Sequence, residues 1–149
     1  MKNIKSYNLF IYIIALIAII LSTNEVLSQD PWKSSQLMAP SELNKIINNS
    51  KAAKTYIFSI GFQSIIKNSI DIGAGMDKAN INKLKLQLKK LPKDANIVIY
   101  CGCCPFKNCP NVRPVFNLLN EMGFKNHKLL DLPQNIKVDW IDKGYSCTK

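Results

Sequence analysis

The sequence predicts one α/β domain of three layers, in which helices flank a mainly parallel central sheet. Short β-branched and aromatic runs alternate along the chain with segments whose apolar residues recur at helical spacing. The clearest of these runs, NIVIY, is uncharged, which is typical of a parallel strand buried on both faces. The chain has 149 residues, 47% of them hydrophobic, which is enough for one globular core and too few for two.

Residues 1–28 have the order of charge, apolar run and small residues that is typical of a secretory signal peptide. The uncharged run, residues 9–21, is shorter than the roughly 20 residues that a membrane-spanning helix needs. We expect cleavage after Ser28, a periplasmic or secreted protein, and no stable membrane insertion after cleavage. An uncleaved anchor is the alternative. A polar lead-in over residues 29–40 then precedes the folded domain, which is expected over residues 41–149.

The first half of this domain predicts one strand between two helices. Ser41 is expected to cap the first helix. The run TYIFSI, residues 55–60, predicts a buried strand. An irregular stretch with glycine turns follows it over residues 61–75. The apolar spacing of residues 80–91 predicts the second helix, which Pro92 is expected to end.

The second half predicts two strands and two helices. NIVIY, residues 96–100, predicts a strand, and a cysteine-rich loop over residues 101–110 follows it. Asn111 is expected to cap a helix whose apolar stripe ends at Gly123, a residue suited to a left-handed C-cap. HKLLDL, residues 127–132, predicts the next strand, and IKVDWIDKG predicts a last helix before a short tail.

The net charge of +10 does not point to nucleic acid. Lysines are spread over the mature chain without a dense block, and Arg113 is the only arginine. Base and phosphate recognition depends heavily on arginine forks, so we expect a solvated lysine surface and no nucleic-acid partner.

Four of the five cysteines lie in the loop that links the NIVIY strand to the following helix. In open parallel sheets, ligands gather at the carboxyl ends of the strands, where the next helix presents its free N–H groups. Cys101 directly follows the strand. We expect loop amides, the helix N-terminus and Arg113 to lower the pKa of the Cys101 thiol, which makes Cys101 the candidate nucleophile. Arg113 is expected to hold an incoming anion.

Several segments taken together resemble the rhodanese-like sulfurtransferase domain. The likeness rests on NIVIYCG, on NVRPVFNLLNEMGFKNHKLL, on the closing DWIDKGY, and upstream on YIFSIG and SIDIGAG. It extends from about Ser41 to Tyr145. This chain departs from the family in its longer loop, which leaves Arg113 only approximately at the family's arginine, and in Ser59 and Gly61, where the family has an acidic and a basic residue.

The resemblance implies that Cys101 carries a persulfide. A small sulfur-containing donor such as thiosulfate would supply the sulfur, and a thiol or a cyanide-like acceptor would receive it. Neither a cofactor nor a metal is expected for this reaction. The active-site loop that would cradle the terminal sulfur through its backbone N–H groups consists of Gly102, Cys103, Cys104, Pro105, Phe106, Lys107, Asn108 and Cys109.

The additional thiols of the loop leave three interpretations open. A neighbouring thiol could resolve the chemistry on Cys101 by forming a disulfide with it. A disulfide such as Cys104 to Cys109, or one that reaches Cys147, could staple the loop. The third interpretation is a metal site. The spacing of the cysteines disfavours zinc, whereas copper(I), a soft ion, stays open. The alternative function is therefore a non-enzymatic thiol-redox or copper-binding module on the same fold.

Few other side chains are expected to take part in chemistry. His127, the only histidine, begins a strand, which predicts a place at the opposite end of a parallel sheet from Cys101. A Cys–His catalytic pair is therefore not expected. Asp131 and Asp139 are expected to be solvated surface residues.

Overall fold

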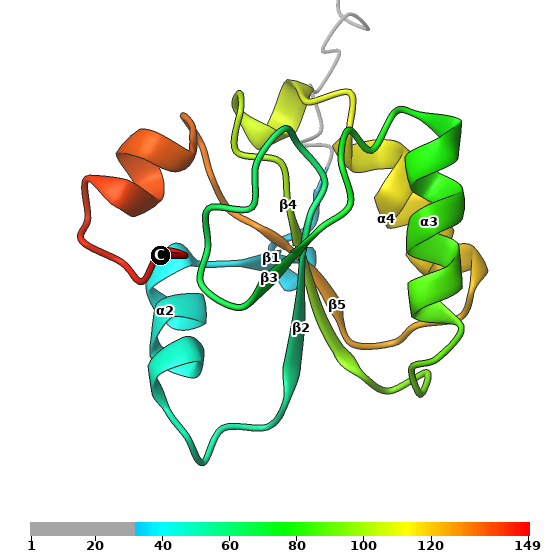
Figure 1. Cartoon of the computed structure of the whole chain (residues 1–149), viewed down its shortest axis with the longest axis horizontal. Helices are drawn as coiled ribbons and strands as arrows, with labels where there is room; N and C mark the ends of the chain where they lie inside the picture. Colours follow the sequence, from blue (N-terminus) through cyan, green and yellow to red (C-terminus); the bar gives the residue numbers. More distant parts are fainter. Residues whose placement is uncertain (1–31) are drawn as a thin grey trace, which may run out of the picture. The chain divides into compact units, whose positions relative to one another are not determined.

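The computed structural model describes residues 32–149, so the predicted signal peptide over residues 1–28 lies outside the described residues. The described part has an α/β fold built on a five-stranded sheet, and every strand pairing is parallel (Figure 1). The strands are β1 (Leu37–Met38), β2 (Thr55–Ser59), β3 (Ser69–Asp71), β4 (Asn96–Tyr100) and β5 (His127–Leu130). Their order across the sheet is β1-β5-β4-β2-β3. The helices of residues 32–149 include none long and apolar enough to cross a membrane.

The predicted strand NIVIY is confirmed as β4, with the predicted bounds. It is the central strand and pairs with β2 on one side and β5 on the other. Its last four residues are buried, because strands cover both edges and helices cover both faces. The residues that follow the carboxyl end of β4 are therefore attached to a rigid strand that is paired on both sides.

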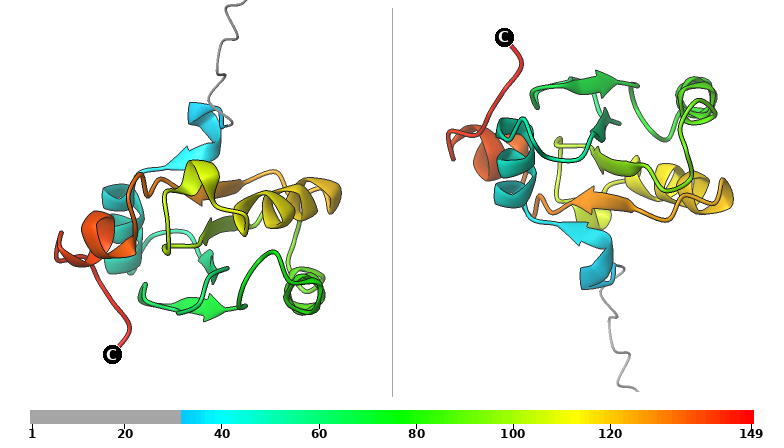
Figure 2. Two further views of the ribbon diagram at one scale, coloured as in Figure 1. Left: turned by 90° about the horizontal axis from the view of Figure 1, so that it is seen from above. Right: turned by 90° about the horizontal axis from the view of Figure 1, so that it is seen from below.

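Helices cover both faces of the sheet (Figures 1 and 2). The helices are α2 (Pro40–Asn48), α3 (Lys78–Leu88) and α4 (Val112–Glu121), with short turns η1 (Ser34–Gln36) and η2 (Phe106–Asn108) and a π-helical segment η3 (Lys137–Ile141). Figure 1 places α3 and α4 on one side and α2 with η3 on the other. Two separate apolar cores result, one under α3 and α4 and one under α2 and η3.

Two strands of the sheet were not predicted. β1 lies in the lead-in and pairs with β5, and β3 lies in the stretch predicted to be irregular and pairs with β2. Both are edge strands, of two and three residues, with partly exposed side chains. Such short segments have no alternation to detect, and their partners in the sheet determine their conformation.

The predicted N-cap of α2 is wrong, and the predicted C-cap of α4 is confirmed. α2 begins at Pro40 with Ala39 as its N-cap, so the prediction that Ser41 caps this helix is wrong. Proline at the first position needs no N–H partner and has the right φ for a helix start. Gly123 follows α4 with a φ of 76°, which confirms the left-handed cap. The predicted last helix is present, although it is wound as the π-helical segment η3.

Candidate functional site

Cys101 lies where the sequence places it, directly after the buried end of the central strand β4. Gly61, just beyond β2, passes close to it. A Cβ atom on Gly61 would lie 2.4 Å from the Cys101 carbonyl oxygen and 3.2 Å from its Sγ. Only glycine fits this approach, so Gly61 forms part of the floor of the site rather than a simple turn.

The four loop thiols form one cluster. The Sγ atoms of Cys101 and Cys103 lie 3.1 Å apart, and those of Cys103 and Cys104 lie 3.4 Å apart. The sulfur atoms of Cys101, Cys103 and Cys109 all lie within 4.8 Å of one another. Cys101 and Cys109 are buried and Cys103 is exposed, so the cluster extends from the core to the surface.

Asn111 contacts Cys101 and does not make the capping hydrogen bond that the sequence predicts. It precedes α4 as expected, but its side chain makes no capping hydrogen bond to the helix. Its Oδ1 accepts from the Met76 N–H at 3.1 Å, and its Nδ2 donates to Cys101 Sγ at 3.3 Å. The Met76 contact turns the amide so that its donor faces the sulfur. Asn111 is only 3% exposed, which shields this hydrogen bond from water.

Hydrogen bonds lower the pKa of the Cys101 thiol from 9.0 to about 5. The largest contribution comes from the Cys109 thiol, and the Cys103 N–H, the Asn111 amide and the Cys103 thiol add to it. Burial opposes them because it disfavours the charged form. At neutral pH the sulfur of Cys101 is therefore a thiolate.

The two thiols that donate to Cys101 are themselves held protonated. Partial desolvation of its sulfur atom, followed by the contacts with Cys101 and Cys104, raises the pKa of the Cys103 thiol to about 12. Donation to Cys101, together with burial, raises the pKa of the Cys109 thiol. The cluster therefore carries one negative charge on Cys101, supported by neighbouring S–H groups.

Arg113 lies in the first turn of α4, as expected, but its guanidinium points elsewhere. It is exposed and lies over the ring of Trp32, 5.6 Å from the ring centroid. It is not among the groups that lower the pKa of Cys101. The structure therefore assigns the electrostatic role that we expected of Arg113 to the thiols and to Asn111.

Some of the remaining loop residues anchor the loop to the core, and others contact the sulfur of Cys101. Phe106 is buried in the core under α3 and α4, and its N–H donates to the carbonyl of Leu132 at 3.2 Å. The N–H groups of Asn108 and Cys109 also donate to carbonyls, within the turn η2. Among these loop amides it is the Cys103 N–H that donates to Cys101.

A small pocket of about 120 Å³ opens beside the thiolate. Cys101, Gly102 and Cys103 form one wall, and Phe62, Gln63, Ile65, Tyr100 and Ile136 complete the lining. Phe62 is 80% exposed at the rim. The lining of this pocket is mostly apolar.

Cys147 takes no part in this cluster. It packs against the core under α2 and η3, whereas Cys101, Cys104 and Cys109 belong to the core on the other face of the sheet. All five cysteines are free thiols in the structure. Neither disulfide that the sequence left open, Cys104 to Cys109 or one that reaches Cys147, is present in the structure, and the loop thiols contact one another instead.

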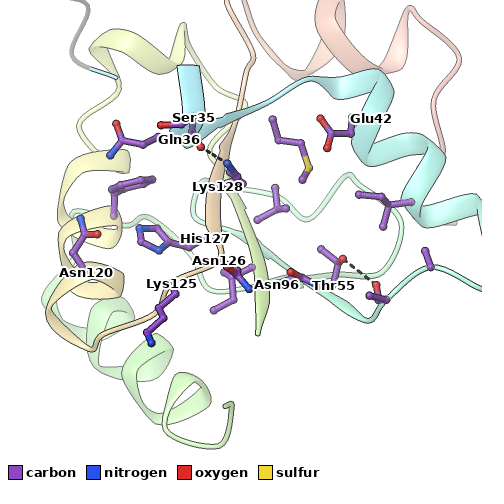
Figure 3. A pocket seen from close by; sticks show the side chains of 17 residues that line it. Ser35, Gln36, Glu42, Thr55, Asn96, Asn120, Lys125, Asn126, His127 and Lys128 are labelled. Atoms are coloured by element: carbon purple, nitrogen blue, oxygen red, sulfur yellow. Dashed lines mark hydrogen bonds between the residues drawn. The ribbon is translucent and has the colours of Figure 1, made fainter. Parts of the chain in front are cut away.

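A larger cavity of about 780 Å³ lies at the opposite ends of the strands (Figure 3). Its lining includes Thr55, Asn96 and His127, the first residues of β2, β4 and β5. This confirms the prediction that His127 lies far from Cys101. The ring of His127 packs on Phe116, and burial lowers the pKa of its imidazole. Its Nδ1 lies 3.1 Å from the Phe124 carbonyl oxygen, so this histidine is oriented by the backbone.

Asp139 is also more than a solvated surface residue. Its Oδ2 accepts hydrogen bonds from the N–H groups of Gln134 and Asn135, at 2.7 and 2.9 Å. It is half-buried and stabilises the turn that leads into η3. That turn carries Ile136, which lines the pocket beside Cys101.

No family model, no curated protein and no solved structure matches this chain.

Proposed function

We propose that this chain is an exported rhodanese-like domain of three layers, in which Cys101 carries sulfane sulfur as a persulfide. The observation that carries the proposal is a buried thiolate at the carboxyl end of the central strand, beside a small pocket. The motifs around the strand and the following helix support the family assignment. The all-parallel sheet with helices on both faces is compatible with it.

In the first half-reaction, the Cys101 thiolate attacks the outer sulfur of thiosulfate. The S–S bond of thiosulfate breaks, sulfite leaves with the electron pair, and Cys101 keeps the transferred sulfur as a persulfide. The pKa of about 5 keeps the nucleophile ionised at neutral pH. The hydrogen bonds from Cys109, Cys103 and Asn111 hold the sulfur in one position. This chemistry needs neither a cofactor nor a metal.

Release of sulfite in a single turnover tests this proposal. We expect the reduced protein, freed of reductant and mixed with thiosulfate, to release about one equivalent of sulfite per chain. Cys101→Ser should release none. Cys147→Ser is the matched control, because its thiol lies against the other core, and it should behave as the wild type does. Sulfite release that survives in Cys101→Ser would remove Cys101 from the reaction.

A second candidate function is binding of copper(I). The observation that favours it is the approach of three sulfur atoms, from Cys101, Cys103 and Cys109, to within 4.8 Å of one another. Copper(I) prefers soft thiolate ligands, and an ion bound here would displace the thiol protons. In this case the full chain would bind about one copper(I) per molecule in a competition titration against a chelator. Cys109→Ser would lose this binding, Cys147→Ser would keep it, and thiosulfate would yield no sulfite.

A further inference from the structure

Cys101 and Cys103 are brought together by the residue between them. Gly102 has a φ of 79°, a backbone conformation that residues other than glycine rarely adopt. A Cβ atom on Gly102 would also lie 2.8 Å from the Cβ atom of Ile136. The Ile136 N–H also donates to the Gly102 carbonyl at 2.9 Å. The two cysteines therefore line the same pocket, with their sulfur atoms 3.1 Å apart.

This contact places Cys103 beside the atom that it would attack in a persulfide. In a Cys101 persulfide, Cys101 Sγ is the inner sulfur, and an S–S bond needs its two sulfur atoms to approach from 3.1 Å to about 2 Å. That change is within the reach of small side-chain rotations. The outer sulfur can be accommodated in the pocket beside Cys101.

The other loop thiols are less suited to this role. Cys109 is 3% exposed, so a disulfide made with it would be closed to an outside reductant. The Sγ atom of Cys104 lies 3.4 Å from that of Cys103, so Cys104 contacts Cys103 rather than Cys101. Cys103 alone is both in contact with Cys101 and exposed to solvent.

We propose that Cys103 resolves the Cys101 persulfide, releasing sulfide and leaving a Cys101–Cys103 disulfide. This inference rests on the proposed function and names the group that reduces the transferred sulfur and releases it as sulfide. The Cys103 sulfur forms a bond to Cys101 Sγ, and the bond between Cys101 Sγ and the outer sulfur breaks. The outer sulfur leaves with the electron pair and takes the Cys103 proton, as hydrosulfide. Two thiols are oxidised to the disulfide, and the transferred sulfur is reduced to sulfide.

Formation of the persulfide makes Cys103 a better nucleophile. The pKa of the Cys103 thiol is raised by partial desolvation of its sulfur atom and by its hydrogen bond to the Cys101 thiolate. When Cys101 carries a second sulfur, the negative charge moves to the outer atom, and this hydrogen bond no longer holds the Cys103 proton as strongly.

The resulting disulfide needs a reductant for the next turnover. An external dithiol protein or small dithiol would attack the exposed Cys103 sulfur and release the Cys101 thiolate. Over a full cycle, the chain would convert thiosulfate to sulfite and sulfide at the expense of one dithiol.

Single turnover of the full chain with thiosulfate, without added reductant, tests the inference. We expect about one equivalent of sulfide per chain and the loss of two thiols. Trypsin should then yield a peptide over residues 94–107, which holds Cys101, Cys103 and Cys104, lighter by two hydrogens. A disulfide to Cys109 would instead join this peptide to the one over residues 108–125. Fragmentation of the peptide should place the bond between Cys101 and Cys103.

Two serine variants complete the test. Cys103→Ser should still release sulfite but no sulfide, and its peptide should gain one sulfur on Cys101. Cys147→Ser is the matched control, because its thiol packs against the core on the other face of the sheet, and it should release sulfide as the wild type does. The inference is overturned if the wild type keeps a stable persulfide, if Cys103→Ser still releases sulfide, or if the disulfide involves Cys104 or Cys109. Absence of sulfite from every form would overturn the proposed function, and this inference with it.

Discussion

Cys101 differs from the other cysteines in the number of donors around its sulfur. The thiols of Cys109 and Cys103, the Cys103 N–H and the Asn111 amide all favour its ionised form. Burial alone would have the opposite effect, since it disfavours a charge. A buried cysteine with this surrounding is a nucleophile, whereas a buried cysteine in an apolar surrounding is inert.

Replacement of Asn111 tests the contribution of one donor. Asn111→Ala removes the hydrogen bond to Cys101 Sγ and should raise the pKa of Cys101 by about one pH unit, because a hydrogen bond to a charged group contributes about 1.5 kcal/mol. The pH dependence of iodoacetamide alkylation at Cys101 measures the change. Asn117→Ala, an exposed position on the same helix, is the control and should leave the pKa unchanged. Equal midpoints in Asn111→Ala and the wild type would remove Asn111 from the site.

At the scale of elements, the site forms where four segments meet. The residue directly after β4 is Cys101, the segment just beyond β2 supplies Gly61, the N-cap of α4 is Asn111, and the turn before η3 supplies Ile136. The parallel order of the sheet brings the ends of β2 and β4 to the same edge. Because each segment is anchored by the core, the thiolate is positioned by the fold and not by the loop alone.

The approach of Gly61 to Cys101 makes a prediction at this scale. Gly61→Ala places a Cβ 2.4 Å from a backbone carbonyl oxygen, so β2 and β4 must separate locally. We expect a loss of about 1–3 kcal/mol in the free energy of unfolding, together with slower alkylation of Cys101. Gly144→Ala is the control, since its Cβ meets nothing within 4 Å and only its φ of 69° is strained. It should lose some stability in urea unfolding and leave the alkylation rate unchanged.

Across the whole molecule, the sequence predicted the long regular elements and missed the contacts between them. Five uncharged residues were enough to predict β4 with its bounds, and an apolar stripe was enough for α4. β1 and β3 are too short to leave a pattern of their own. The role of Asn111 depends on Met76, which lies 35 positions earlier in the chain, so an asparagine before a helix could only be interpreted as a cap.

Ionisation of Cys101 links the stability of the whole molecule to pH. The folded pKa of about 5 lies below the ordinary value of 9.0, so its contribution to stability is fully present above pH 9 and is lost as the pH falls toward 5. The Cys103 and Cys109 thiols, whose pKa values are raised, stay protonated in the folded chain over this range, and in the unfolded chain they ionise only as the pH nears 9.

We therefore expect the free energy of unfolding of the reduced wild type to fall more steeply between pH 9 and pH 5 than that of Cys101→Ser. Urea unfolding of both forms at several pH values measures the difference, and contributions from groups that do not contact Cys101 cancel in the comparison. Parallel curves for the two forms would mean that Cys101 has the same pKa in the folded and unfolded chain.

The most direct measurement is the pKa of Cys101 in the reduced full chain. Alkylation with iodoacetamide at a series of pH values, followed by fragmentation of the peptide over residues 94–107, gives the rate at Cys101 separately from Cys103 and Cys104. The account predicts a rate that rises through a midpoint near pH 5. A midpoint near 9.0, the ordinary value for a cysteine thiol, would contradict it.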